Sequence, residues 1–263
     1  MVNSWLMLAG IGMILAGALP ILWWWRKKRT SLKYFIFGAA VWFVVILLKL
    51  LMDITLTPSL TNYLQSYGTL ALAVSLGFYV GLRTGLFESG FTYIAGVKTK
   101  LKQINFDEAV AFGLGFGGIE AILLGLQSFL NILVFALMPT LLNQLPAGQQ
   151  AIMQHQLNQS TWIVFAPILE RTATLVIHVF AAVLVFFSIH SFEKRYFVYS
   201  VGFKSLVDGI IPALTVYVGS STLLSTYLME LPILGLGLVA AGGVLWVKDK
   251  WRNLDAKGND SVE

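Results

Sequence analysis

Long apolar segments separated by short polar ones run through almost the whole chain. Residues 39–48 are continuously apolar, whereas a transmembrane β-strand would alternate apolar and polar residues. About 20 apolar residues in a helix cross a hydrocarbon core of roughly 30 Å, because each residue adds 1.5 Å. The pattern therefore predicts seven transmembrane helices, at residues 4–25, 33–54, 67–94, 108–138, 161–189, 197–218 and 223–247.

The composition supports an integral membrane protein without a sizeable soluble domain. Of the 263 residues, 57% are hydrophobic and 12% are charged, whereas soluble domains carry about 25% charged residues. We therefore expect residues 1–247 to form a single all-α transmembrane domain, followed by a charged cytoplasmic tail at 248–263. The tail and the uncharged polar segment at 143–159 are expected to be mobile.

Lysine and arginine gather in alternate loops, at residues 26–29, 98–102, 194–195 and 248–252, and are absent from 54–66 and 139–160. Positively charged loops stay in the cytoplasm, which places the N-terminus outside and the C-terminus inside. The net charge of +5 then reflects topology, so we expect a lipid bilayer and no nucleic acid as partner. The predicted location is a cell membrane, most simply a bacterial plasma membrane.

Ionisable residues inside the spans are the candidate functional residues, because each costs a few kcal/mol to insert into a bilayer. The chain has no cysteine, which excludes thiolate metal sites and a cysteine nucleophile. Lys49, Asp53, His190 and Glu193 lie near predicted helix ends, where we expect them to be solvated at the membrane surface. The deeper candidates are Glu88, Glu120, Glu170, Arg171, His178, Lys204 and Asp208.

Several of these candidates also have a purely structural interpretation. Glu88 could pair with Arg83, Glu170 with Arg171, and Lys204 with Asp208 four residues later on the same helix. A backbone carbonyl could satisfy His178.

The glycines near Glu88 and Glu120 have a structural interpretation as well. Gly77, Gly81 and Gly85, like Gly113 and Gly117, have the spacing of close helix packing rather than of a phosphate-binding loop.

The alternating topology nevertheless places five of the polar residues at a similar depth, in the cytoplasmic half of the bilayer. These residues are Glu88, Glu120, His178, Lys204 and Asp208, and they come from four different helices. Carboxylates and a histidine in a dry cavity suit acid–base hydrolysis of a peptide bond, or a proton or ion pathway. No internal repeat supports the transporter alternative.

Four short motifs resemble one family. They are Gly85-Leu86-Phe87-Glu88 with Tyr93, Gly117-Gly118-Ile119-Glu120-Ala121, Glu170-Arg171 with His178, and Leu206-Val207-Asp208. Together they resemble the YhfC group of membrane peptidases, which is related to the CAAX-type and PrsW-type intramembrane proteases. The resemblance implies an intramembrane endopeptidase with Glu88 as the glutamate that activates water, and a membrane-protein or peptide substrate. It also implies catalytic roles for Glu120, His178 and Asp208, and supporting roles for Tyr93, Glu170, Arg171 and Lys204.

The chain departs from the family pattern at four positions. Ser89 and Thr92 stand where a second glutamate and an arginine are usual, and Phe116 and Lys204 stand where two histidines are usual. A lysine repels a cation, so the sequence predicts no cofactor, although it leaves the binding of a metal open. Lys204 could instead stabilise an oxyanion.

Two hypotheses therefore stay open. One is a peptidase that works by glutamate-activated water, with activity impaired by the missing histidines. The other is a non-catalytic relative that acts as a binding, immunity or scaffold protein.

Overall fold

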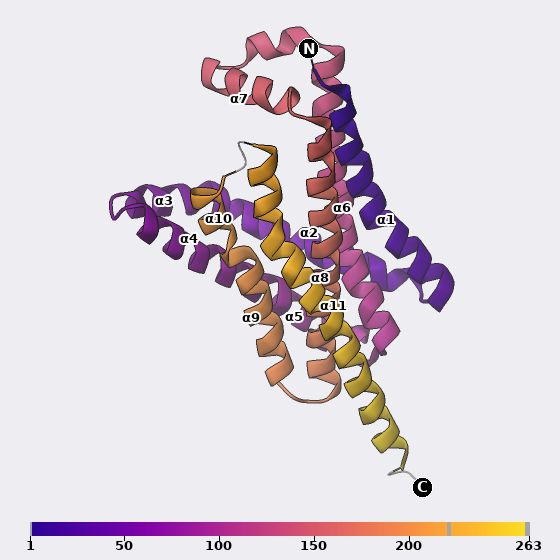
Figure 1. Ribbon diagram of the computed structural model, residues 1–263. Coiled ribbons are helices and arrows are strands. Elements are labelled where there is room, and N and C mark those ends of the chain that lie inside the picture. Colours follow the sequence, from indigo (N-terminus) through magenta and orange to yellow (C-terminus); the bar gives the residue numbers. More distant parts are fainter. Residues whose placement is uncertain (1, 220–221, 261–263) are drawn as a thin grey trace.

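Helices make up the computed structural model, which describes residues 2–219 and 222–260 and is drawn in Figure 1. Seven helical stretches in this part of the chain are long and apolar enough to span a membrane, and no strand occurs in it. This confirms the predicted all-α, multi-pass membrane fold. The stretches are α1 (Met7–Lys28), α2 (Leu32–Thr55), α4 with α5 (Thr69–Thr84 and Gly90–Lys98), α6 (Phe106–Leu137), α8 (Phe165–His190), α9 with α10 (Arg195–Gly209 and Ile211–Tyr217) and α11 (Leu223–Asp260).

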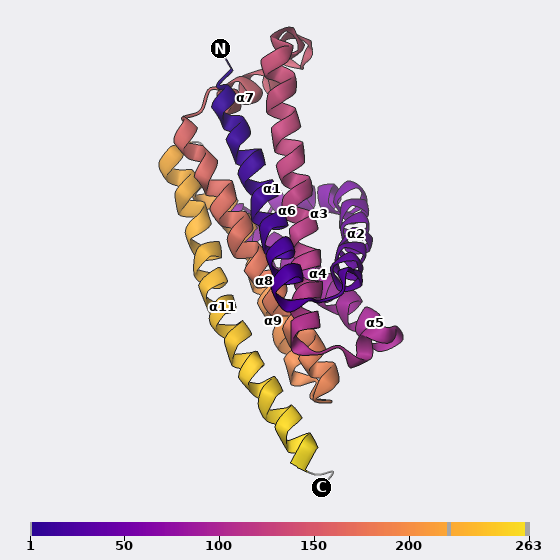
Figure 2. The ribbon, with the colours of Figure 1, turned by 90° about the vertical axis from the view of Figure 1, so that its right-hand side faces the viewer.

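Helices α6 and α8 form the centre of the bundle. Helix α6 packs against α1, α2 and α8, and α8 packs against α1, α9 and α11, as Figures 1 and 2 show from two sides. Every residue of α8 from Ile177 to Ile189 is buried, because neighbouring helices cover this part of the helix on all sides. By contrast, α2 and α4 both cross the bundle at a steep angle to α6 and α8 (Figure 1).

The two ends of the bundle differ in charge. The N-terminus and α7 (Ala147–Leu157) lie at one end, which we call the uncharged end, and the C-terminal part of α11 projects from the other, which we call the basic end (Figure 1). The segment at 143–159, expected to be mobile, instead contains α7 and part of a short 3-10 helix at Pro139–Gln144. The segment at 54–66 likewise contains α3 (Thr57–Gln65).

The expected mobile tail is also helical as far as Asp260, since α11 runs without interruption from Leu223. The reason is that apolar contacts continue beyond the apolar run: Trp251 stacks on His190 with ring centres 4.9 Å apart and meets Phe106 edge-on. Residues 261–263 lie outside the described part of the chain.

Two irregularities interrupt the spans beside candidate site residues. A π-helical turn at Gly85–Ser89 joins α4 to α5 and contains Glu88. Span six breaks between α9 and α10 just after Asp208, where Pro212 occupies the first turn of α10 and lacks the N–H group needed to continue α9. The predicted continuous helices at 67–94 and 197–218 are therefore each divided, and π-helical turns often occur at functional sites.

Candidate functional site

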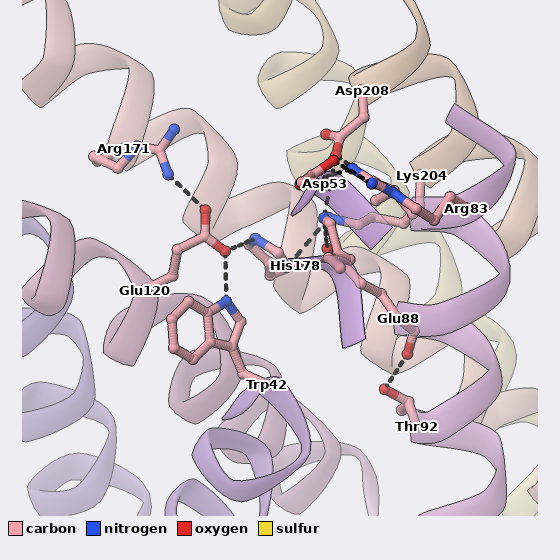
Figure 3. A network of polar contacts seen from close by, with 12 residues as sticks. Trp42, Asp53, Arg83, Glu88, Thr92, Glu120, Arg171, His178, Lys204 and Asp208 are labelled. Atoms are coloured by element: carbon pink, nitrogen blue, oxygen red, sulfur yellow. Dashed lines mark hydrogen bonds and ion pairs between the residues drawn. The ribbon is translucent and has the colours of Figure 1, made fainter. Parts of the chain in front are cut away.

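Glu88 lies at the centre of a buried network of charged side chains (Figure 3). Its Oε2 atom is 2.7 Å from Nζ of Lys204 on α9, and its Oε1 atom is 3.1 Å from Nζ of Lys49 on α2. Nδ1 of His178, on α8, is 3.6 Å from the same Oε2 atom. Three helices thus direct nitrogen atoms at one carboxylate that is only 6% exposed.

Glu120, on α6, lies at the centre of a second set of contacts. Its Oε2 atom accepts hydrogen bonds from Nε1 of Trp42 at 2.8 Å and lies 3.2 Å from Nε2 of His178. Its Oε1 atom accepts from Arg171 at 2.6 Å. Arg171 also donates to both oxygens of its neighbour Glu170, so the predicted pairing of these two residues forms, and Glu120 shares the same guanidinium.

His178 joins these two sets of contacts. One ring nitrogen faces Glu120, while the other faces Glu88 and lies 3.3 Å from Nζ of Lys204. The ring packs against Phe116 with centres 5.0 Å apart. We call this arrangement the Glu88–His178–Glu120 chain. The imidazole separates the two carboxylates, so that each occupies a different edge of the ring.

Asp208 joins the network through Lys49 rather than through Lys204. Its Oδ2 atom accepts a hydrogen bond from Thr84 at 2.6 Å and lies 3.5 Å from Nζ of Lys49. The pairing of Lys204 with Asp208 that the four-residue spacing allowed does not form, because Lys204 is directed across the helix interface at Glu88.

Two other sequence-based interpretations need correction, those of Lys49 and Arg83. Lys49 was expected at the membrane surface, but the steep path of α2 carries it into the network, whereas the side chain of Asp53 is 41% exposed. Arg83 was a candidate partner of Glu88, but it donates instead to Asp53, with distances of 2.5 and 3.4 Å. Tyr93 packs on Phe197 with ring centres 5.0 Å apart and makes no hydrogen bond to the network within the described residues.

Trp42, Lys49 and Thr84 are network members that sequence reasoning did not select. A signal for two of them exists, because Trp42 and Lys49 are seven residues apart and therefore lie on nearly one face of α2. An indole N–H in the middle of a span also needs an acceptor.

The four positions at which the chain departs from the family pattern are neighbours in space. Ser89, Thr92, Phe116 and Lys204 all border one small void beside Glu88 and His178, with a volume of about 10 Å³, no more than one water needs. Ser89 shares a hydrogen bond of 2.8 Å with Ser200, and Thr92 donates to the backbone carbonyl of Glu88 at 2.7 Å.

Close helix packing holds the charged side chains in place. A Cβ atom at Gly81 would overlap the backbone carbonyl of Ser205, the residue next to Lys204, and one at Gly117 would lie 2.9 Å from the His178 ring. The small residues therefore let α4 approach α9, and α6 approach α8, at the positions that bring Lys204 to Glu88 and His178 to Glu120.

A larger space, which we call the site cavity, reaches the network. It has a volume of about 560 Å³. Leu124 and Gln127 border both this cavity and a second one of about 1060 Å³ that lies next to α7 at the uncharged end. The ionisable side chains along the site cavity are Lys49, Glu88, Glu120, Glu170, Arg171, His178, Lys204 and Asp208.

The charges of the site nearly cancel. Lys49, Arg171 and Lys204 compensate all but one of the four carboxylates at Glu88, Glu120, Glu170 and Asp208. Such compensation makes burial of the carboxylates tolerable in a low-dielectric interior.

Comparison with known families agrees with the motifs. The model of the YhfC intramembrane metalloprotease family matches residues 12–231. The chain belongs to this family. No curated protein and no solved structure matches it. Membership makes the chain a relative of membrane proteases and raises the question of whether this YhfC member can hold a catalytic metal.

The residues of the site do not fit a catalytic metal. Such a metal normally has three protein ligands and an open position for water, but no three His, Cys, Asp or Glu side chains in the described residues converge in this way. Glu88 and Glu120 contact different nitrogen atoms of His178, on opposite edges of its ring. The carboxylate oxygens of both already contact lysine, arginine or tryptophan, and lysine is a donor without a free lone pair.

Proposed function

We propose that this YhfC member hydrolyses a peptide bond at the membrane by means of water that Glu88 activates, without a metal. The observation that carries the proposal is the Glu88–His178–Glu120 chain on the wall of the site cavity. It supplies a carboxylate as the base and a histidine oriented by a second carboxylate, which are the groups that acid–base hydrolysis needs.

The contact between Lys204 and Glu88 supports a defined sequence of proton transfers. Glu88 accepts a proton from water, and the resulting hydroxide attacks the carbonyl carbon of the substrate. As Glu88 becomes neutral, the Lys204 ammonium 2.7 Å away is released to donate to the oxyanion that forms on the carbonyl oxygen. The carbon–nitrogen bond then breaks, and Glu88 returns its proton to the departing amine.

Glu120 acts in this scheme through His178. Its contact with Nε2, at 3.2 Å, fixes the ring so that Nδ1 faces Glu88. Trp42 and Arg171 hold Glu120 in turn. In this proposal Glu88 is the catalytic residue, and Glu120 is a positioning residue.

One observation favours a second candidate function. Both oxygens of Glu88 already contact ammonium groups, from Lys204 and Lys49, so water must share or displace a contact before Glu88 can act as a base. A site locked in this way suits a non-catalytic relative that binds a membrane protein, as an immunity or scaffold protein does.

The test compares membranes that contain the wild type with membranes that contain Glu88→Gln or Glu120→Gln. New protein N-termini are measured by mass spectrometry after incubation. The control is Glu193→Gln, which changes a carboxylate that is 44% exposed and pairs with Arg195. Cleavage close to transmembrane segments should appear with the wild type and the control and disappear in Glu88→Gln. Products unaffected by Glu88→Gln would refute the peptidase and favour the binding role.

A further inference from the structure

The ammonium group of Lys204 is enclosed between two groups that are typical metal ligands. Its nitrogen lies 2.7 Å from Oε2 of Glu88 and 3.3 Å from Nδ1 of His178, and these two atoms are themselves 3.6 Å apart. Lys204 is only 3% exposed. We propose that this ammonium takes the place of a metal ion, so that a lysine built into the chain is the permanent cation of the site.

The distances do not allow a metal ion and the Lys204 ammonium to occupy the site together. Zinc binds carboxylate oxygen and imidazole nitrogen at about 2.0–2.2 Å. An ion bound to Oε2 of Glu88 and Nδ1 of His178 would therefore lie within about 3.5 Å of the Lys204 nitrogen on whichever side it bound. A divalent ion and an ammonium that close together repel each other strongly in a low-dielectric interior.

The other carboxylate oxygens of Glu88 and Glu120 are also occupied, so they do not offer a metal a second binding position. Oε1 of Glu88 contacts Lys49, and the two oxygens of Glu120 contact Trp42, His178 and Arg171. A metal at either carboxylate would have to displace a cation or an indole N–H. The site thus lacks a third ligand as well as the space.

The packing keeps Lys204 where it is. Helix α9 lies against the glycines of α4 so closely that the backbone around Ser205 touches them. Val207, on the same helix, is also buried. The stem of Lys204 is therefore enclosed by packed helices, and the side chain reaches the site cavity beside Glu88 and His178. This cation differs from a bound metal in that it cannot dissociate.

The inference concerns how the site is held together, and it applies whether or not the site hydrolyses peptides. Its tests therefore read metal content and stability rather than activity. A failure of the peptidase proposal leaves the inference intact. A bound metal, in contrast, would contradict both the inference and the metal-free form of that proposal, but not peptide hydrolysis itself.

The first test is the metal content of the wild-type chain, purified in detergent without chelators and measured by elemental mass spectrometry. We expect far less than one metal ion per chain and a Tm that a chelator leaves unchanged. About one metal ion per chain, together with a lower Tm after chelation, would overturn the inference. This test needs no variant.

The second test removes the cation. In Lys204→Met, Glu88 and His178 face each other without the ammonium, so added Zn²⁺ should bind there through these two side chains and water, and raise the Tm by mass action. Zn²⁺ should leave the wild type and the matched Lys204→Arg variant unchanged, because both keep a cation. An equal rise in Tm in all three proteins, or no rise in Lys204→Met, would contradict the proposal.

Discussion

Nζ of Lys49 lies 3.1 Å from Oε1 of Glu88, although 39 positions separate the two residues in the sequence. The same ammonium reaches Asp208 at 3.5 Å. One side chain of the steep helix α2 therefore connects the span that contains Glu88 with the span that contains Asp208. This contact makes the two carboxylates depend on α2, even though none of the four family-like motifs includes it.

Replacing Lys49 by methionine should destabilise the fold by about 3–5 kcal/mol, because removing one partner of a buried ion pair leaves an uncompensated charge. Unfolding in denaturant, followed by tryptophan fluorescence in detergent micelles, measures the free energy. Lys98→Met is the control, since Lys98 lies at the end of α5 and makes no side-chain hydrogen bond within the described residues. Equal stability of the two variants would mean that the contact is dispensable.

The contacts of Glu120 should differ in strength. Trp42→Phe removes one hydrogen bond to a charged group, at a cost of about 1.5–3 kcal/mol. Arg171→Met removes the shared cation of Glu120 and Glu170 and should cost about 3–5 kcal/mol. The same unfolding measurement ranks the two variants. A larger loss in Trp42→Phe than in Arg171→Met would be inconsistent with Arg171 as the main counter-ion.

Gly81→Ala should separate α4 from α9, because the added methyl group would overlap the backbone carbonyl of Ser205. Overpacking of this kind costs about 1–3 kcal/mol. The matched control is Gly90→Ala, since Gly90 begins α5 with open space around it, and replacing a helical glycine by alanine there should stabilise by about 0.5–1 kcal/mol. Opposite signs of the change in Tm for the two variants are the expected result.

Trp251→Ala should loosen the C-terminal half of α11 from the bundle. Trp251 is 2% exposed and packs on Phe187 and His190, and truncation of such a side chain costs about 3–5 kcal/mol. Limited proteolysis should then cut between Lys248 and Lys257 faster than in the wild type. Leu245→Ala, on an outward-facing and 62% exposed position of the same helix, should leave the rate unchanged.

The number and order of the spans follow from the sequence, because a hydrocarbon core of fixed thickness demands apolar runs of a fixed length. The grouping of Glu88, Glu120, His178, Lys204 and Asp208 could also be anticipated, since alternating topology assigns a depth to every residue. Depth alone, however, does not say which side chains touch.

Which side chains form pairs depends on the tilt and rotation of each helix. Both are set by packing against the neighbouring helices. Lys204 has Asp208 within reach on its own helix, yet it contacts Glu88 because the glycines of α4 bring that helix close. Lys49 seemed to belong to the surface because a helix perpendicular to the membrane would carry it there. The steep path of α2 is a property of the assembled bundle, and no local pattern in residues 33–54 encodes it.

The π-helical turn at Gly85–Ser89 has a consequence for insertions and deletions. Residues four apart drift by about 40° around a regular α-helix, yet Gly77, Gly81, Gly85 and Ser89 all meet the same span, at Gly209, Ser205, Val201 and Ser200. The wider turn absorbs the drift by accommodating one additional residue. Deleting a single residue there would restore a regular α-helical turn, so a chain that had lost one codon would keep all seven spans but lose the wider turn in which Glu88 faces both lysines.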